Sequence, residues 1–596
     1  MNLDFLNGWT RTHLSTDVSQ DLVDKEVLLM GWVLRRRDHG GVIFVDLRDR
    51  AGLVQVIFNP EFAPEAHRKA HHLRPEWVVA VRGVVRLRPE ESVNPDLPTG
   101  TIEVFAEELR TLNSSEPPPF PLDDETPPTD AVRYRYRYLD LRREGGARKC
   151  LLIRHLMAAI VRDFLNKEHF VDVETPFLTV STPEGARDYL VPSRVNPGQF
   201  YALPQSPQIF KQLLMVAGFE RYYQIVRCFR DEDLRADRQP EFTQVDMEMS
   251  FIEEDTIFDI IERLMARIFA EVLEVNLEIP FPTLPYDEAL RRFGLDKPDI
   301  RFGMELTDIS DIVKGTQFGV FRVAVESGGI VKALKVANGE RLSRKELDDL
   351  RDFAAIYGGK GVAYARIKEG GEWQSPIAKF LSDDERAKIV AQVEAHPGDV
   401  VLFAADSAQI VNDVLGNLRN SLAQRLGEIP HGEHRFVWIT DFPMFEYDKD
   451  EGRFQSMHHP FTSPRQEDLH LLESDPAKVR SRAYDLVLNG SEIGGGSIRI
   501  HRSDLQKMVF SALKIGPEEA EEKFGFLLEA LRFGAPPHGG IALGFNRMVA
   551  IITGSESIRD VIAFPKTQRA TCPLTGAPAS VTPEQLRELN LKIVKK

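Results

Sequence analysis

The order of apolar and polar positions divides the chain into regions of different character. Between residues 26 and 109 five short β-rich runs, EVLLMGWVL, VIFVDLRD, LVQVIF, WVVAVRGVVRL and TIEVFAEEL, alternate with polar turns. Strand-forming runs at this spacing predict a small closed β-barrel. From about residue 301 to 427, strands alternate instead with helical stretches rich in Lys and Glu, which predicts a self-contained α+β unit.

Charged and aromatic residues in the first region indicate a ligand for the predicted barrel, which is of the OB type. Arg35, Arg36 and Arg37 lead into a turn, and Phe44 and Gln55 follow on adjacent strands. Cations, an aromatic ring for stacking and an amide for base edges suit single-stranded nucleic acid. An ordinary barrel with solvated arginines and a core phenylalanine explains the same residues equally well.

Two stretches after the barrel predict a boundary between domains. Residues 113–130 are dense in Pro and acidic residues, so they cannot form a regular element and are interpreted as a hinge. After them Arg133, Arg135 and Arg137 alternate with tyrosines. We expect an extended segment whose basic face either braces an RNA or closes the domain boundary, and we favour the second role.

Helical periodicity marks the next region. Leu152, Leu156, Ile160 and Phe164 form a stripe at helical spacing within residues 149–170. The strand predicted after it, 171–176, ends in proline, which suits a sheet edge. A second amphipathic helix is predicted at 255–275.

Residues 222–251 concentrate charge within two apolar, strand-like segments, 222–229 and 242–251. A polar turn containing proline separates them, which predicts a β-hairpin. A sheet can bury charges such as Asp246 and Glu248 only if they meet partners, because an unpaired buried ion costs more than one hydrogen bond returns. A salt-bridged surface hairpin is the alternative.

Two later segments carry candidate nucleotide chemistry. In AYDLVLNGSEIGGGSIRIH, residues 483–501, Asp485 and Glu492 flank a turn next to three glycines. Two carboxylates facing polyphosphate suit Mg²⁺, which takes few protein oxygens and many waters or phosphates. Residues 536–554 predict a glycine-rich strand that leads through Arg547 into a helix. The sequence contains no GxxxxGK[ST] segment, so a P-loop nucleotide site is excluded.

Weaker signals lie at a helix start and at a histidine pair. Gln208 and Lys211 follow a Pro-punctuated turn into a predicted helix, where free N–H groups favour an anionic ligand and a small zwitterionic amino acid would fit. A capped helix start is the commoner explanation. His458 and His459 are adjacent, but without a nearby third ligand they indicate a loop more than a metal site.

Composition bounds the class of protein. A chain of 596 residues with 42% hydrophobic content predicts about three to five globular domains. No apolar run approaches a membrane span, the start lacks a signal-peptide pattern, and three scattered cysteines fit a reducing compartment, so we expect a cytoplasmic protein. The net charge of −16 argues against non-specific binding to nucleic acids, and against DNA as a partner, but local basic patches can still serve a folded RNA.

These motifs together resemble those of the class II aminoacyl-tRNA synthetases, and the set TPEGARDY, QSPQIFKQ, FRDEDLRADRQPEFTQ, MHHPFT and GGGSIRIH resembles the bacterial aspartyl-tRNA synthetases. The helix and Pro-ended strand match motif 1, the charged hairpin motif 2, and residues 536–554 motif 3. The last has GFNR where the family usually has GLDR or GMDR, which puts little in doubt because Gly and Arg carry the contacts.

The resemblance implies a multidomain α+β fold with an N-terminal OB-fold β-barrel, a class II antiparallel-sheet catalytic domain and an α+β insertion domain. The expected boundaries are an anticodon-binding domain at 1–112, a hinge at 113–132, catalytic parts at 133–298 and 428–565, the insertion at 299–427 and a C-terminal extension at 566–596. It also implies a homodimer formed through motif 1.

The implied reaction activates L-aspartate with ATP and Mg²⁺ and then transfers the aspartyl group to the 3′ end of tRNA. The resemblance implies that Arg230 and Arg547 are catalytic residues and that Asp485 and Glu492 bind Mg²⁺. The aspartate-binding residues implied are Glu184, Gln208, Lys211, Arg230, Asp246, His458, His459 and Arg499. Those implied for ATP are Arg230, Asp231, Glu232, Gln239, Phe242, Glu492, Gly544, Phe545, Asn546 and Arg547.

Recognition of the tRNA anticodon is implied for Arg37, His39, Phe44, Gln55, Glu91 and Glu103. Within the family, histidine at position 39 tends to mark enzymes that charge both tRNA-Asp and tRNA-Asn, whereas those enzymes often have Gly where this chain has Glu91. The balance slightly favours dual use over strict tRNA-Asp specificity. A catalytically silent tRNA-binding paralogue should have lost Arg230, Arg547 or an acidic ligand. A lysyl or asparaginyl enzyme should lack the insertion and the Arg499 and Lys211 pair.

Overall fold

The computed structural model describes residues 3–122, 128–181, 186–232, 238–449 and 451–594, and the chain divides into two compact units, Met1–Lys149 and Cys150–Lys596. Glu184, expected to bind aspartate, lies outside the described residues. None of the described helices is both long and apolar enough to cross a membrane.

The first unit contains the closed barrel predicted from the sequence, with strand order β1-β2-β3-β5-β4. Its alternating apolar residues fill the interior, and Gly40 and Gly41 turn the chain between β1 and β2 with φ of 62° and 82°. The elements are β1 (Glu26–His39), β2 (Val42–Arg48), β3 (Leu53–Phe58), α1 (Pro64–Ala70), β4 (Val78–Leu87) and β5 (Ile102–Asn113).

The segment expected to be extended after the hinge is helical, and that prediction was wrong. Helices α2 (Asp130–Arg135) and α3 (Arg137–Asp140) replace it. Arg137 is fully buried and pairs with Asp140 at 2.5 Å. Alternation of Arg and Tyr imitated a strand, but the ion pair between residues three apart requires a helical turn.

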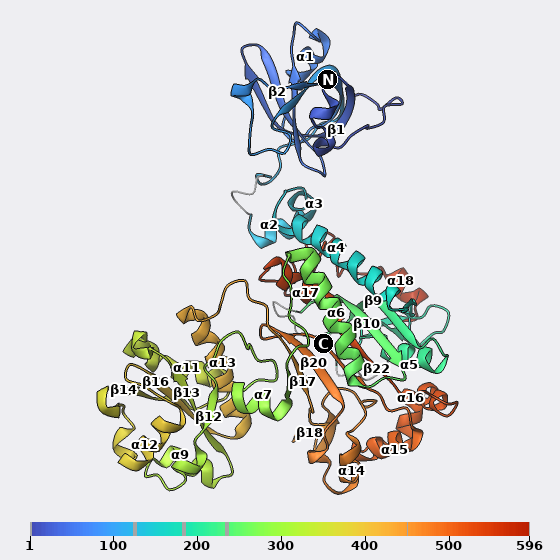
Figure 1. The fold of residues 1–596 in the computed structure, drawn as a ribbon. Helices are drawn as coiled ribbons and strands as arrows, with labels where there is room; N and C mark the ends of the chain where they lie inside the picture. The colour runs from blue at the N-terminus through green and yellow to red at the C-terminus, as the bar shows by residue number, and fades with distance from the viewer. Residues whose placement is uncertain (1–2, 123–127, 182–185, 233–237, 450, 595–596) are drawn as a thin grey trace. The chain divides into compact units, whose positions relative to one another are not determined.

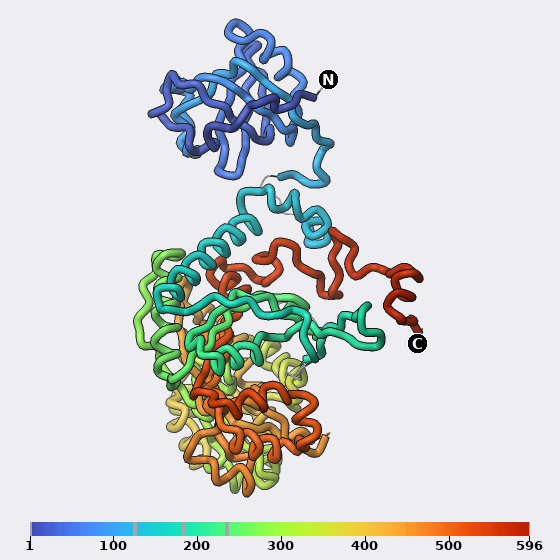
Figure 2. Tube along the Cα trace, turned by 90° about the vertical axis from the view of Figure 1, so that its right-hand side faces the viewer, coloured from blue at the N-terminus to red at the C-terminus, as the bar shows by residue number. Residues whose placement is uncertain are grey.

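The second unit is built on an eight-stranded sheet with order β11-β17-β20-β21-β22-β10-β9-β6. Strands far apart in sequence lie side by side in it, such as β10 and β22 (Figure 1, Figure 2). Its interior strands pair antiparallel, as expected for class II enzymes. The strands are β6 (Val171–Asp172), β9 (Arg221–Phe229), β10 (Glu241–Ser250), β11 (Thr283–Pro285), β17 (Phe436–Thr440), β20 (Ala483–Leu488), β21 (Ser491–Ile498) and β22 (His538–Gly544).

Helices α4 (Gly146–Lys167), α6 (Glu254–Leu273) and α17 (Phe545–Thr553) pack their apolar sides against this sheet and form its main core (Figure 1). The predicted stripe on α4 is only half buried. Ile160 and Phe164 are in the core, whereas Leu152 and Leu156 are 60% and 42% exposed. Residues spaced exactly four apart do not stay on one side of a helix with 3.6 residues per turn. At the start of α4 the side chains that face the core are therefore Cys150 and Met157 instead of the two leucines.

The α+β unit predicted within 301–427 forms a second sheet, of order β12-β13-β16-β14-β15. Alternate residues of β16 face two different apolar cores, one lined by α13 and the other by α9 and α12. Its elements are β12 (Leu306–Asp308), α8 (Ser310–Val313), α9 (Gly319–Glu326), β13 (Ile330–Val336), α10 (Arg344–Asp348), α11 (Leu350–Ile356), β14 (Ala363–Ile367), β15 (Trp373–Gln374), α12 (Asp383–Gln392), β16 (Val400–Asp406) and α13 (Ala408–Leu426).

Smaller elements complete the second unit. They are β7 (Leu190–Pro192), β8 (Phe200–Ala202), α5 (Gln208–Val216), α7 (Tyr286–Phe293), β18 (Phe445–Asp448), β19 (Arg453–Ser456), α14 (Leu471–Ser474), α15 (Ser503–Ala512), α16 (Pro517–Leu531) and α18 (Pro583–Glu588).

The close packing of β10 against β22 predicts an unequal response to two glycine substitutions. A Cβ at Gly540 would lie 2.1 Å from the Met247 carbonyl oxygen and 2.0 Å from Glu248 Oε2, whereas at Gly544 the nearest atom is 3.6 Å away. We expect Gly540→Ala to lower the free energy of unfolding by about 2–4 kcal/mol and Gly544→Ala to change it by less than about 1 kcal/mol. Urea unfolding of both variants measures this, and equal stabilities would contradict the packing.

Candidate active site

The site face of the large sheet carries a row of charged residues on β10 separated from β20 by small residues. Side chains of β10 alternate, so Val245, Met247 and Met249 enter the core while Asp246 and Glu248 point to the opposite face. Across the strands, Asp246 is in register with Ala542, then Gly495, then Asp485. Three strand spacings of about 4.8 Å leave an open floor between the two carboxylates.

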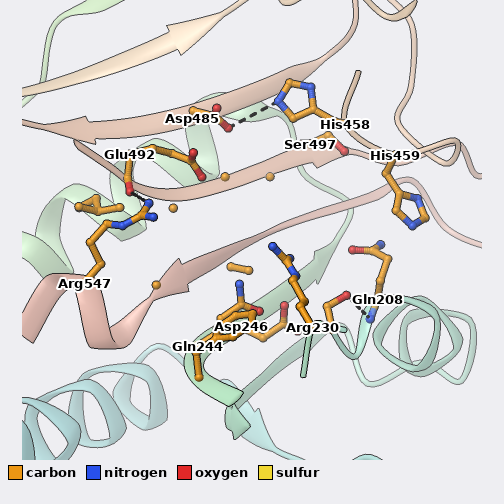
Figure 3. A pocket seen from close by; sticks show the side chains of 18 of the residues that line it. Gln208, Arg230, Gln244, Asp246, His458, His459, Asp485, Glu492, Ser497 and Arg547 are labelled. Atoms are coloured by element: carbon orange, nitrogen blue, oxygen red, sulfur yellow. Dashed lines mark hydrogen bonds and ion pairs between the residues drawn. The ribbon is translucent and has the colours of Figure 1, made fainter. Parts of the chain in front are cut away.

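A cavity of about 520 Å³ opens on this floor, a size typical of small-molecule sites. In Figure 3, Asp485 and Glu492 lie on one wall with Arg547 beside Glu492, while Asp246, Arg230 and Gln208 lie on the opposite wall. We call the group Lys211, Asp246, Glu248 and Arg499 the ion-pair end of the pocket. The group Asp485, Glu492 and Arg547 is called the acidic end.

The ion-pair end is a closed set of two buried cations and two buried anions. Arg499 donates from Nε and Nη2 to the two oxygens of Glu248 at 2.9 and 3.2 Å. Lys211 Nζ donates to Asp246 Oδ1 at 2.7 Å and lies 3.2 Å from Glu248 Oε2. All four side chains are almost fully buried, so each charge depends on the others.

The pKa values at this end follow from burial and charge. Burial alone would raise the pKa of Glu248, but the charges of Arg499 and Lys211 outweigh it and hold that pKa below its ordinary value. Burial raises the pKa of Asp246 more than Lys211 lowers it. The two cations therefore stabilise the ionised form of Glu248 more than that of Asp246. The ionised form of Asp246 would be stabilised further by an additional positive partner.

Several shielded polar atoms around the pocket lack a hydrogen-bond partner among the described residues. They are Gln208 Nε2, Arg230 Nε, Asp246 Oδ2 and His459 Nε2. Such atoms cost free energy unless a ligand or water meets them. The acceptor on Asp246 suits an ammonium group, and the donors suit oxygens.

Arg499 and His459, which both line the cavity, have donors that no described residue uses. Arg499 Nη1 donates to Ser497 Oγ at 2.7 Å, so three of the five guanidinium N–H groups are engaged and two are left. The Phe461 backbone N–H donates to His459 Nδ1, which places the proton of the neutral ring on Nε2. Burial and Arg499 lower the pKa of His459 to about 3, so the ring is neutral at working pH. The arrangement is suited to a carboxylate.

The acidic end places two carboxylates together on one hairpin. Asp485 and Glu492 lie on β20 and β21, and a Cβ at Gly495 would come within 2.5 Å of Asp485 Oδ1, so glycine there makes room for the carboxylate. Burial and then the charge of Asp485 raise the pKa of Glu492. A cation between the two would relieve this repulsion.

Two carboxylates fit Mg²⁺, which needs few protein ligands. Across the residues that the structure describes, no three His, Cys, Asp or Glu side chains are arranged to hold a metal. Water or phosphate oxygens would complete the shell.

The chain matches the description "tRNA synthetases class II (D, K and N)" over residues 129–568 and "OB-fold nucleic acid binding domain" over residues 27–112. It belongs to the class II tRNA synthetases of this group. It is 57% identical to an aspartate–tRNA(Asp/Asn) ligase of Desulfotalea psychrophila over 99% of this chain and 97% of that protein. A ligase of the same name from Halothermothrix orenii is 56% identical, with 99% of each chain covered.

The fold is shared with a solved synthetase structure. Asparaginyl-tRNA synthetase from Pyrococcus horikoshii, complexed with asparaginyl-adenylate, superposes with a TM-score of 0.58 at 19% identity, covering 94% of this chain and 98% of that one. At this identity the likeness concerns the fold alone.

In the synthetase, most of the site residues expected from the sequence line one cavity: Gln208, Lys211, Arg230, Glu232, Gln239, Phe242, Asp246, His458, His459, Asp485, Glu492, Arg499, Gly544, Asn546 and Arg547. Two expected ATP ligands do not line it. Phe545 is buried in the core, and the backbone N–H of Asp231 donates to the Arg187 carbonyl oxygen at 3.0 Å.

Some lining residues have partners that the sequence did not reveal. Arg154 of α4 donates to Asn546 Oδ1 at 2.6 Å and to Thr243 Oγ1 at 2.9 Å, which links α4 to the start of α17. The Gln239 side chain exchanges hydrogen bonds with the backbone of Lys566 at 3.1 and 2.9 Å. Both contacts join segments hundreds of residues apart, so neither leaves a local sequence signal.

The barrel residues expected to read an anticodon fall into two groups. Arg37 donates to Asp46 at 2.9 Å and to Gln55 at 3.2 Å, and Gln55 donates to Glu103 at 3.0 Å. Phe44 is in register with Arg37 and half buried on the same face. The two specificity positions, 39 and 91, are exposed and lie at a strand end and in a short 3₁₀ turn.

Four residues of the site were not expected from the sequence: Glu248, which anchors Arg499, and Ser497, Gln244 and Asp296, which line the cavity. Glu248 could have been found, because it lies two residues from Asp246 on a strand and therefore shares its face.

The ion-pair end predicts a pH-dependent loss of stability in Glu248→Gln. The amide leaves Arg499 and Lys211 with too little negative charge, so we expect unfolding free energy to fall by about 3 kcal/mol at pH 7. Because the pKa of folded Glu248 lies below its ordinary 4.5, this stabilisation is complete above about pH 4.5. It is lost as pH falls through the folded value, so the difference from wild type should shrink there.

Denaturant unfolding at pH 7, 5 and 4 measures this dependence. Glu253→Gln is the matched control, because Glu253 is 74% exposed in its pair with Arg482, and we expect a change below about 1 kcal/mol. A Glu248→Gln protein as stable as the control would show that the buried pairs contribute nothing.

Proposed function

We propose that this synthetase activates L-aspartate with ATP and transfers the aspartyl group to the 3′ end of tRNA. The observation that carries the proposal is the ion-pair end. Its two cations are already neutralised by Asp246 and Glu248. Two N–H groups of Arg499 and the Nε2–H of His459 nevertheless have no partner among the described residues, and both side chains line the cavity. Those donors suit the side-chain carboxylate of aspartate, and the free Asp246 Oδ2 suits its ammonium group.

The first step then needs only positioning and neutralised charge. The α-carboxylate of aspartate attacks the α-phosphate of ATP, forming a mixed anhydride and releasing pyrophosphate. Arg230, whose guanidinium lies 5.2 Å from the Phe242 ring, would meet the α-phosphate, and the ring would stack on adenine. Arg547 would meet the γ-phosphate. Asp485 and Glu492 would hold Mg²⁺, which neutralises phosphate charge when bound.

The same geometry selects against asparagine. A carboxylate offers two acceptor oxygens to the remaining donors of Arg499 and His459, whereas a side-chain amide offers one oxygen and would turn its NH₂ group toward a donor. A buried polar group left unpaired in this way costs several kcal/mol of binding, or more than about 100-fold in rate.

Arg499→Leu should abolish aspartate activation. The change removes the fork that holds the carboxylate, so we expect aspartate-dependent ATP–pyrophosphate exchange to fall by at least about 1000-fold. Arg502→Leu is the matched control, because Arg502 is 63% exposed and pairs with Asp504 at the surface. Circular dichroism confirms folding, and Arg499→Lys, which keeps a cation for Glu248, serves as a second variant. Exchange at the wild-type rate in Arg499→Leu would refute the assignment.

We further propose that the barrel binds the tRNA anticodon and that both tRNA-Asp and tRNA-Asn are charged. Phe44, Arg37 and Gln55 share one outward face, where a stacking ring lies beside hydrogen-bonding groups. Dual use is favoured by His39 and by relatives named aspartate–tRNA(Asp/Asn) ligases. Glu91 is the residue that argues for a stricter enzyme.

Aminoacylation of purified tRNA-Asp and tRNA-Asn tests both statements. Wild type should charge both, and absence of Asp-tRNA-Asn would refute dual use. Phe44→Ala should lower kcat/KM for tRNA by about 10- to 100-fold, because one stacked base is worth roughly 1–3 kcal/mol. ATP–pyrophosphate exchange without tRNA is the internal control and should not change. A loss of exchange would instead indicate a damaged fold.

A homodimer formed through α4 and the segment after it is also proposed. Exposed apolar side chains gather there: Leu152, Leu156, Val171, Phe177, Leu178 and Val180. Large apolar side chains left exposed in this number along one stretch favour a partner surface. We assign the anticodon-binding domain, the two catalytic parts, the insertion and the C-terminal extension to the residue ranges expected from the sequence.

A further inference from the structure

The segment that leads from α7 into the second sheet contributes one residue to the lining of the pocket. Gly294, whose φ is 74°, caps the end of α7, and residues 295–305 follow before β12. Asp296, in this segment, lines the cavity with Asp485 and Glu492. Within the described part of the chain no hydrogen bond or ion pair engages its carboxylate. The insertion junction therefore contributes a side chain to the active site.

Arg419 on α13, the last helix of the α+β unit, binds the backbone of this segment. Arg419 is fully buried and donates from Nη2 to the carbonyl oxygens of Asp299, Phe302 and Gly303, each at 2.8 Å. Its guanidinium also lies 4.0 Å from the Phe302 ring centre. A planar fork that meets several carbonyls at once fixes a backbone that has no regular structure of its own.

Two further contacts from the same unit fix the end of α7. A Cβ at Gly416 would come within 2.9 Å of the Phe293 carbonyl oxygen, so the two helices touch through glycine. Lys332 of β13 donates to the Leu290 and Arg291 carbonyl oxygens at 2.9 and 3.1 Å, which caps the helix end. The position of Asp296 is set from the insertion side.

The catalytic side touches the same segment. Asp299 lies 3.2 Å from the place a Cβ would occupy on Gly490, the turn residue between β20 and β21. These two strands carry Asp485 and Glu492. The segment is thus held between α13 and the hairpin of the acidic end. The negative charge of Asp296 acts on the acidic end, because it contributes to raising the pKa of both Glu492 and His458.

We propose that the α+β unit positions Asp296, through Arg419, so that its carboxylate attracts the hydrated divalent cation that accompanies ATP. The inference rests on the proposed function and gives the insertion a role in the first step. Asp485 and Glu492 would hold the cation, and Asp296, which lines the same cavity, would add its negative charge. Arg419 is a positioning residue that touches no substrate.

The test compares Asp296→Asn, Arg419→Lys and the double variant with wild type. Losing one negative charge near the cation should raise the Mg²⁺ concentration for half-maximal aspartate-dependent exchange by about three- to tenfold, with KM for aspartate unchanged. Binding of Mn²⁺ with ATP, followed by electron paramagnetic resonance without aspartate, should weaken by the same factor. Arg419→Lys keeps the positive charge but loses the planar guanidinium that binds three carbonyl oxygens. It should therefore also raise the Mg²⁺ requirement and weaken Mn²⁺ binding.

Asp413→Asn is the matched control. Asp413 lies on α13 near Asp296, which contributes to raising its pKa after burial, but it does not line the cavity. Its Mg²⁺ requirement should equal that of wild type. The double variant should be no worse than Asp296→Asn alone if Arg419 acts through Asp296.

The three variants separate the role of Asp296 from that of Arg419. A wild-type Mg²⁺ requirement in Asp296→Asn, with normal exchange, overturns the role of Asp296, and additive effects in the double variant overturn that of Arg419. Absence of aspartate-dependent exchange in wild type would refute the proposed function instead, while the Mn²⁺ and ATP measurement would still decide the inference. Asp296→Asn leaves the Arg419 contacts in place, so this arm does not depend on the folding of Arg419→Lys.

Discussion

The ion pairs of Glu248 with Arg499 and of Asp246 with Lys211 are the constraint on which the site depends. Two carboxylates on the site face of a central strand are stable only because two cations reach them. Their bulk requires small neighbours, and β22 and β21 supply Gly540, Ala542 and Gly495 in register. The floor that results is wide and nearly free of side chains. The small residues that accommodate the buried ion pairs therefore also leave space for a ligand.

Strand and helix positions were largely predictable because local periodicity determines them. The barrel, the charged hairpin and the glycine-rich strand appear where the alternation of residues placed them. The prediction was wrong where a pattern had two explanations. Alternating Arg and Tyr at 133–138 imitates a strand, yet the buried pair of Arg137 with Asp140 holds a helical turn. Leu152 and Leu156 fit the helical spacing but lie on the exposed side of α4.

The candidate site was predictable where a motif carries its residues and not where distant segments meet. Arg230, Asp485 and Arg547 each stand in a recognisable local pattern and line one cavity. Asp296 has no such pattern, because its place depends on contacts made by α13 more than a hundred residues later. Arg154 reaches Asn546 across nearly four hundred residues in the same way. The spacing of residues along a sequence does not reveal such contacts between distant segments.

The two ends of the pocket are stabilised differently. At the ion-pair end every charge has an internal partner, so the donors for a carboxylate are in place before a ligand arrives and little reorganisation is needed. At the acidic end Asp485 and Glu492 repel each other, which burial strengthens. A cation bound between the two would relieve this repulsion. On the proposed function, recognition of the amino acid would need little reorganisation, while the phosphate side would depend on its ion and on the segments that hold the surrounding carboxylates in place.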